Sequence, residues 1–93
     1  MITVGLIKEV NYISRSLGRP ILLSLEARGA LTINIEIEND ILSIRESQEL
    51  IWKESLDEQI GNFGVESCQH IFEILKRKAN GDPYSKLIFL ENS

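Results

Sequence analysis

The sequence predicts an α+β fold: a single two-layer domain in which helices cover one face of an antiparallel sheet of four to five strands. Residues 31–38 alternate apolar and polar side chains without interruption, which is typical of a half-buried strand. Asn39-Asp40 then supplies a two-residue turn, and apolar residues recur with helical spacing near both ends of the chain. The expected element order is α-β-β-β-(β)-α-β, in one domain spanning residues 1–93.

The first helix is expected over residues 3–17. Thr3 suits the N-cap, and Gly18 suits the left-handed residue that ends a helix, with Pro20 close behind it. The apolar stripe that predicts this helix consists of Leu6, Val10, Ile13 and Leu17.

Three antiparallel strands are expected to follow as a meander. Residues 21–28 alternate, and their apolar face agrees with that of residues 31–38 when Leu25 lies opposite Ile33 across a loop at 28–30. The turn at Asn39-Asp40 in turn brings Ile35 opposite Ile44. We therefore expect Leu25, Ile33 and Ile35 in the core.

Two patterns compete over residues 46–60. Residues 49–54 suit a fourth strand with Leu50 and Trp52 facing inward. Trp52, Leu56, Ile60 and Phe63 also have helical spacing, and residues 55–58 match a capping box. We expect a fourth strand followed by a short helix from Leu56 to Ile60.

The C-terminal third predicts a second helix and a last strand. The helix is expected over residues 65–79, stopped by residues 80–83, and its apolar stripe consists of Val65, Cys68, Ile71, Phe72, Leu75 and Ala79. Leu87 to Leu90 form a continuous apolar run, which predicts a strand buried on both faces.

Charge is segregated along the chain. The net charge is −4, yet residues 29–74, the acidic block, hold ten acidic and two basic side chains. Such a block repels phosphate backbones and attracts basic partners. The candidate binding residues are Glu36, Glu38, Asp40, Asp57 and Glu58.

No constellation in the sequence indicates catalysis. Cys68 and His70 are each the only residue of their type, and two positions apart on a helix they point about 200° from one another. Nitrogen and sulfur ligands are too few for a metal site, so we expect no metal, no cofactor and no enzyme activity. The single cysteine and the lack of a long apolar run predict a cytoplasmic protein without a membrane segment.

The function that these observations favour is a non-enzymatic protein–protein interaction module. It would be a small acidic inhibitor, immunity or accessory protein that engages a basic partner surface. The alternative is a nucleic-acid-binding module that uses Gly61–Gly64 and the basic cluster Lys76–Lys78. Gly61–Gly64 is similar to the clamp loop of KH RNA-binding domains, although its two middle residues are not basic. A homodimer is a further expectation, and an enzyme subunit whose site forms only in an oligomer is a third alternative below the other two.

Overall fold

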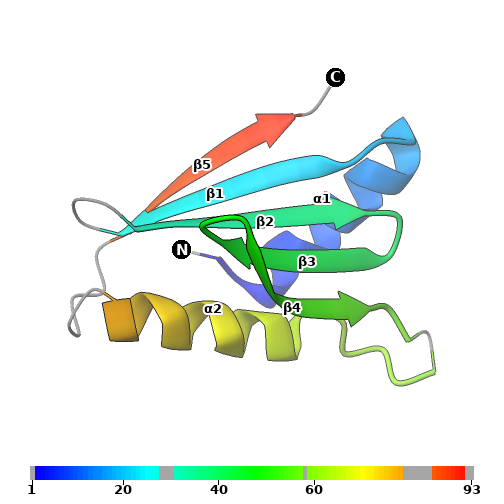
Figure 1. Ribbon diagram of the computed structural model, residues 1–93. Coiled ribbons are helices and arrows are strands. Elements are labelled where there is room, and N and C mark those ends of the chain that lie inside the picture. Colours follow the sequence, from blue (N-terminus) through cyan, green and yellow to red (C-terminus); the bar gives the residue numbers. More distant parts are fainter. Residues whose placement is uncertain (1, 28–30, 58, 79–84, 92–93) are drawn as a thin grey trace.

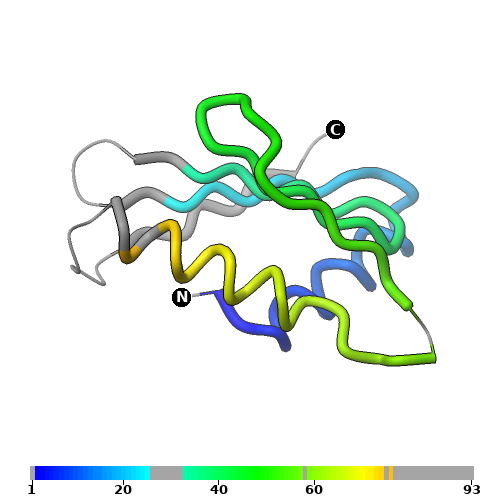
Figure 2. The backbone as a smooth tube through the Cα atoms, turned by 60° about the horizontal axis from the view of Figure 1, so that its bottom comes forward, coloured from blue at the N-terminus to red at the C-terminus, as the bar shows by residue number. Residues whose placement is uncertain are grey.

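A computed structural model of the protein describes residues 2–27, 31–57, 59–78 and 85–91. Its elements in chain order are α1 (Val4–Leu17), β1 (Ile21–Ala27), β2 (Leu31–Glu38), β3 (Ile41–Glu46), β4 (Glu49–Ser55), α2 (Val65–Lys78) and β5 (Ser85–Glu91). The strands form one antiparallel five-stranded sheet in the order β4-β3-β2-β1-β5 (Figure 1). Both helices lie on the same side of it (Figure 2), so the predicted two-layer α+β fold is confirmed.

The predicted register of the meander is also confirmed. Asn39 and Asp40 form the β2–β3 turn with φ values of 42° and 71°, the left-handed conformation that a tight hairpin turn needs. Ile35 pairs with Ile44 across this hairpin, and Leu25 pairs with Ile33 between β1 and β2. The loop at 28–30 lies outside the described residues.

The two faces of the sheet differ in burial: one packs against the helices and the other is exposed to solvent. Eight apolar side chains on the face toward the helices are fully buried, and they include all three predicted core residues: Ile21, Leu23, Leu25, Ile33, Ile35, Ile37, Leu42 and Ile44. Successive strand residues point to opposite faces, so Asn34, Glu36 and Glu38 lie exposed on the other side, here called the outer face.

The bounds of α1 agree with the sequence, but its buried face does not. Thr3 Oγ1 accepts a hydrogen bond from the Leu6 N–H, and Gly18 has a φ of 69°. The buried side of α1 is rotated relative to the predicted apolar stripe, as the 47% exposure of Leu17 shows. The buried side chains of the helix are Ile7, Val10, Asn11 and Ser14.

Two polar residues replace apolar ones on that face because they bind the β2–β3 turn. Asn11 Oδ1 accepts from the Asp40 N–H at 2.8 Å, and its Nδ2 donates to Asp40 Oδ1 at 2.9 Å. Ser14 Oγ accepts from the Asn39 N–H and donates to the Arg19 carbonyl. Buried polar groups with such partners are compatible with a core-facing helix.

The fourth strand is present as β4, but Leu50 does not face inward. Trp52 pairs with Ile44 on the inner face and is half-buried, as predicted. The pairing then shifts, so that Leu50 lies opposite Arg45 and Ile51 is an extra residue in the strand. A bulge of one residue turns the preceding side chains to the other face, and Leu50 is 46% exposed.

The predicted helix from Leu56 to Ile60 is wrong. The described residues of this segment form a turn, in which the Asp57 carbonyl accepts from the Gly61 N–H and the Asp57 carboxylate accepts from the Gln59 N–H. A polar side chain that caps its own backbone favours a turn over a helix. Trp52, Leu56, Ile60 and Phe63 have helical spacing in the sequence, but Trp52 lies in β4 and the other three lie in the segment that joins β4 to α2.

In α2, as in α1, the buried side of the helix differs from the predicted apolar stripe. Among its described side chains, Ser67, Ile71 and Ile74 are buried, whereas Phe72 is 54% exposed and Cys68 is half-buried. The Leu75 side chain and Ala79 lie outside the described residues, as does the predicted stop at 80–83. The last strand is confirmed as β5, antiparallel to β1, but the predicted burial of Leu87 to Leu90 concerns side chains that are not described.

Candidate functional site

Glu36 and Glu38 lie on the outer face of β2, as predicted, and both are exposed. Neither forms an ion pair or a hydrogen bond with any described residue. Glu36 lies between Leu22 and Ser43, and Glu38 lies opposite Ile41, so no directly paired residue is a cation. A central strand thus presents two uncompensated carboxylates on one face, about 7 Å apart along the backbone.

The other predicted binding residues have different surroundings. Asp40 is engaged by Asn11 and by Arg15, whose Nη1 lies 3.5 Å from Asp40 Oδ1. Asp57 is exposed, but its carboxylate caps the turn at Gln59. Glu58 lies outside the described residues. Of the five predicted residues, only Glu36 and Glu38 are described carboxylates that share one face and form no ion pair or hydrogen bond with another described residue.

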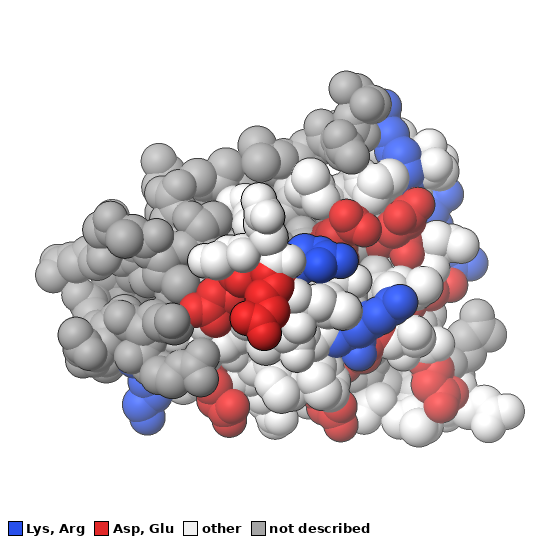
Figure 3. Space-filling model, in the orientation of Figure 1, with Lys and Arg blue, Asp and Glu red and all other residues white. Residues whose placement is uncertain are grey.

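On the face that Figure 3 shows, the described acidic side chains do not form one continuous surface. Figure 3 shows red and blue side chains interspersed over the sheet in the orientation of Figure 1. Lys53 and Arg45 lie on the outer face with the acids, since Lys53 pairs with Ser43 and Arg45 pairs with Asn34. Arg45 Nη1 contacts the Gln48 carbonyl at 3.4 Å, beside the β3–β4 turn. Glu9, Glu49, Glu66 and Glu73 are exposed as well, so Glu36 and Glu38 are distinguished by their place on a central strand of the sheet.

The second half of the Gly61–Gly64 segment packs inward, whereas Gly61 and Asn62 are exposed. Phe63 in its middle is only 3% exposed, and a Cβ on Gly64 would lie 3.0 Å from Ile7 Cγ2. The Gly64 N–H donates a short hydrogen bond to the Glu54 carboxylate. A carboxylate from β4 therefore already engages an amide that a bound phosphate would need at this end of α2. Lys76 is exposed, and the side chains of 77 and 78 are not described.

An aromatic contact joins β4 to α2. The Trp52 indole and the His70 imidazole are stacked, with ring centroids 4.0 Å apart and planes inclined by 26°. Trp52 Nε1 donates to Ser67 Oγ at 3.0 Å. Burial, and to a lesser degree the charge of Glu54, raises the pKa of the nearby Cys68 thiol above its ordinary value. The cluster fastens the helix to the sheet, and a raised pKa makes Cys68 a poor nucleophile.

The described part of the chain contains no group of three or more His, Cys, Asp or Glu side chains arranged to hold a metal ion. None of the described helices has the length and apolar character that crossing a bilayer requires.

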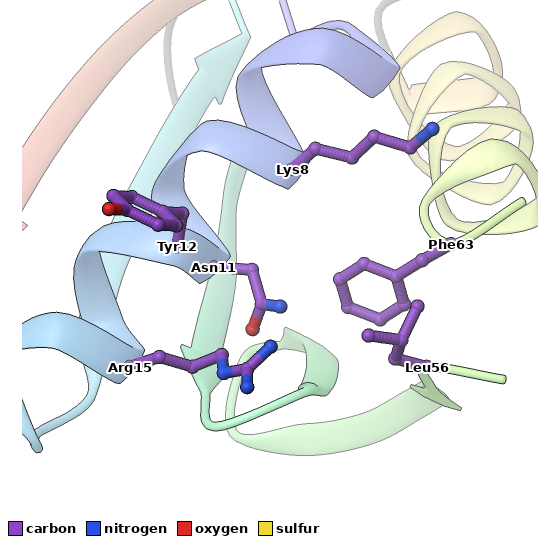
Figure 4. Close-up of a pocket in the computed structure, with 6 residues that line it drawn as sticks. All are labelled: Lys8, Asn11, Tyr12, Arg15, Leu56 and Phe63. Carbon is purple, nitrogen blue, oxygen red and sulfur yellow. The ribbon is translucent and has the colours of Figure 1, made fainter. Parts of the chain in front are cut away.

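A cavity lies between α1 and the segment that joins β4 to α2. Its volume is about 260 Å³, and its lining residues are Lys8, Asn11, Tyr12, Arg15, Leu56 and Phe63. Lys8 and Arg15 extend from α1 towards Leu56 and Phe63, while the Tyr12 ring points away (Figure 4). We call this cavity the α1 groove. It combines an apolar floor with two cationic side chains.

Sequence reasoning missed the α1 groove because its two walls are far apart in the chain. The helical spacing of Lys8 and Arg15, seven residues apart, places them on one side of α1, and that signal was available. Nothing in the local pattern indicated that Leu56 and Phe63 would face them.

Comparison of this chain with protein-family models, with curated proteins and with solved structures finds no match to any of them. The geometry of the molecule alone therefore has to support a functional proposal.

Proposed function

We propose that this protein is a non-enzymatic protein–protein interaction module of the small acidic inhibitor, immunity or accessory type. It engages a basic partner surface with Glu36 and Glu38 on the outer face of the sheet. The observation that carries the proposal is that both carboxylates are exposed on a central strand without a partner among the described residues. Opposite charges placed directly across neighbouring strands stabilise a sheet, and neither carboxylate has a cation directly opposite it.

The backbone that carries Glu36 and Glu38 is rigid, which supports the proposed binding role of these carboxylates. Residues 35 and 37, which flank Glu36 on the strand, are fully buried at 0% exposure, so the backbone beneath the carboxylates is fixed by the core. A side chain on such a strand loses little backbone freedom when a partner binds. Exposed carboxylates of this kind contribute mainly to the association rate and to partner choice.

The nucleic-acid alternative receives less support. Its loop buries Phe63, and the Gly64 N–H is already bound by Glu54. A homodimer stays a prediction. Its basis is that β4 and β5 are the edge strands of the described sheet, and unpaired strand edges favour pairing with another chain. Sedimentation that gives a monomer at high micromolar concentration contradicts it.

The experiment compares two double charge reversals. The test variant carries Glu36→Lys and Glu38→Lys, and the control carries Glu9→Lys and Glu73→Lys, which are exposed on the helices and change the net charge equally. Each protein is immobilised, and the proteins captured from a cell extract are identified by mass spectrometry. A partner retained by the wild type and the control but lost by the test variant is then purified.

Association of that partner is followed by stopped-flow at several salt concentrations. We expect the test variant to slow association at least about tenfold at low salt and to flatten the salt dependence. The control should retain most of the rate. Equal slowing in both variants shows that net charge alone acts, and a partner with an acidic surface contradicts the proposal.

A further inference from the structure

The α1 groove lies on the helical side of the sheet, away from the outer face, so it is a second surface of the molecule. Its floor is fixed: Phe63 is 3% exposed, and the Leu56 N–H donates to the Asp40 carbonyl at 2.8 Å. The hairpin that holds Leu56 is in turn fastened to α1 by Asn11. Both walls of the groove are therefore held together in the folded chain.

The size of the groove limits what it holds. A volume of about 260 Å³ is below the range of roughly 300–1,000 Å³ that is usual for small-molecule sites. This volume corresponds to about nine water molecules. One large apolar side chain with its backbone would fill it. The floor thus suits a single anchoring side chain better than a whole metabolite.

The rim of the groove is cationic. Lys8 is exposed and forms no ion pair or hydrogen bond with any described residue. Arg15 is 52% exposed, and its Nη1 lies 3.5 Å from Asp40 Oδ1. Because a guanidinium has five N–H donors, this one contact leaves donors of Arg15 for a ligand. Two helical turns separate the two cations, which is about 10.5 Å along the axis.

We propose that the α1 groove binds an acidic peptide segment of a partner protein. One apolar or aromatic side chain of the peptide seats against Leu56 and Phe63, and flanking carboxylates meet Lys8 and Arg15. In an extended peptide, alternate side chains share one face, so an acidic–x–aromatic–x–acidic pattern presents all three groups together. Its acidic residues are about 13 Å apart, within the combined reach of the flexible cationic side chains.

The probe is a blocked pentapeptide, Glu-Ala-Phe-Ala-Glu, titrated into uniformly ¹⁵N-labelled protein at low salt. We expect amide shifts to concentrate at α1 and at residues 56–63, with saturation in the micromolar to millimolar range. The same peptide with lysines in place of its glutamates should not bind. Replacing its phenylalanine by alanine should weaken binding, because the apolar anchor is lost.

The matched variants are Lys8→Glu in the groove and Lys53→Glu on the outer face, where the same charge change leaves the groove intact. We expect Lys8→Glu to weaken peptide binding about fivefold or more, and Lys53→Glu to leave it nearly unchanged. Equal weakening in both variants, or no groove shifts at millimolar peptide, overturns the proposal. Tighter binding of phenylpropionate than of the peptide also overturns it, in favour of a small-acid site.

Discussion

Replacing Asn11 by alanine tests the contact that fixes α1 to the sheet. The Asn11 amide makes two hydrogen bonds, one from the Asp40 N–H and one to the Asp40 carboxylate, at 2.8 and 2.9 Å. A neutral hydrogen bond contributes about 1 kcal/mol and one to a charged group about 1.5–3 kcal/mol. The Asp40 side chain is 31% exposed and regains some hydration in the variant, which favours the lower end of that range.

We therefore expect Asn11→Ala to lower the free energy of unfolding by about 2–3 kcal/mol. In a chain of this size that corresponds to a fall of about 10–20 °C in the melting temperature. Asn34→Ala is the matched control, because Asn34 is exposed on the outer face and its side chain forms one hydrogen bond with a described residue, accepted from Ser24 Oγ. Urea unfolding measures both variants. A loss below about 0.5 kcal/mol for Asn11→Ala, or one equal to the control, refutes the reasoning.

Three further outcomes are expected. Ile35→Ala should cost about 2–5 kcal/mol in urea unfolding and Ile41→Ala far less, because Ile35 is fully buried and Ile41 is 39% exposed. Gly64→Ala should cost about 1–3 kcal/mol and more than Gly61→Ala, since both have positive φ but only the Gly64 Cβ would crowd a buried side chain of α1. The raised pKa of Cys68 means that the unfolded chain loses the thiol proton first. Stability should thus fall as the pH rises above about 8.5, and Cys68→Ala should remove that part of the fall.

The β2–β3 hairpin shows what the sequence alone can establish. Strict alternation with a two-residue turn leaves only one register that buries a single face, and Ile35 opposite Ile44 follows from it. The helices show the limit. A stripe of apolar residues gives the bounds of α1, yet Asn11 lies on its buried face because the side chain finds partners in a turn 29 residues away. The periodicity of nearby residues cannot predict a contact between residues so far apart in the chain.

The same limit applies to the candidate site. Composition identified the acidic block, and the alternation of β2 correctly placed Glu36 and Glu38 on a wet face. It could not foresee that Asp40 would be held by Arg15 and Asn11, because those contacts depend on how α1 crosses the hairpin. A bulge at Ile51 likewise turns Leu50 outward, and a single extra residue leaves no trace in an apolar pattern.

The two proposed surfaces have opposite charges and lie on opposite sides of the sheet, which leads to a last expected outcome. Glu36 and Glu38 occupy the outer face, while Lys8 lies on α1 beyond the buried layer. Changes at sites that share no contacts usually add, so Lys8→Glu combined with the Glu36 and Glu38 reversals should show the sum of the separate effects on unfolding free energy. Peptide affinity at low salt should respond mainly to Lys8→Glu, and association with a basic partner mainly to the outer-face reversals. Non-additivity well above about 0.5 kcal/mol contradicts the independence of the two surfaces.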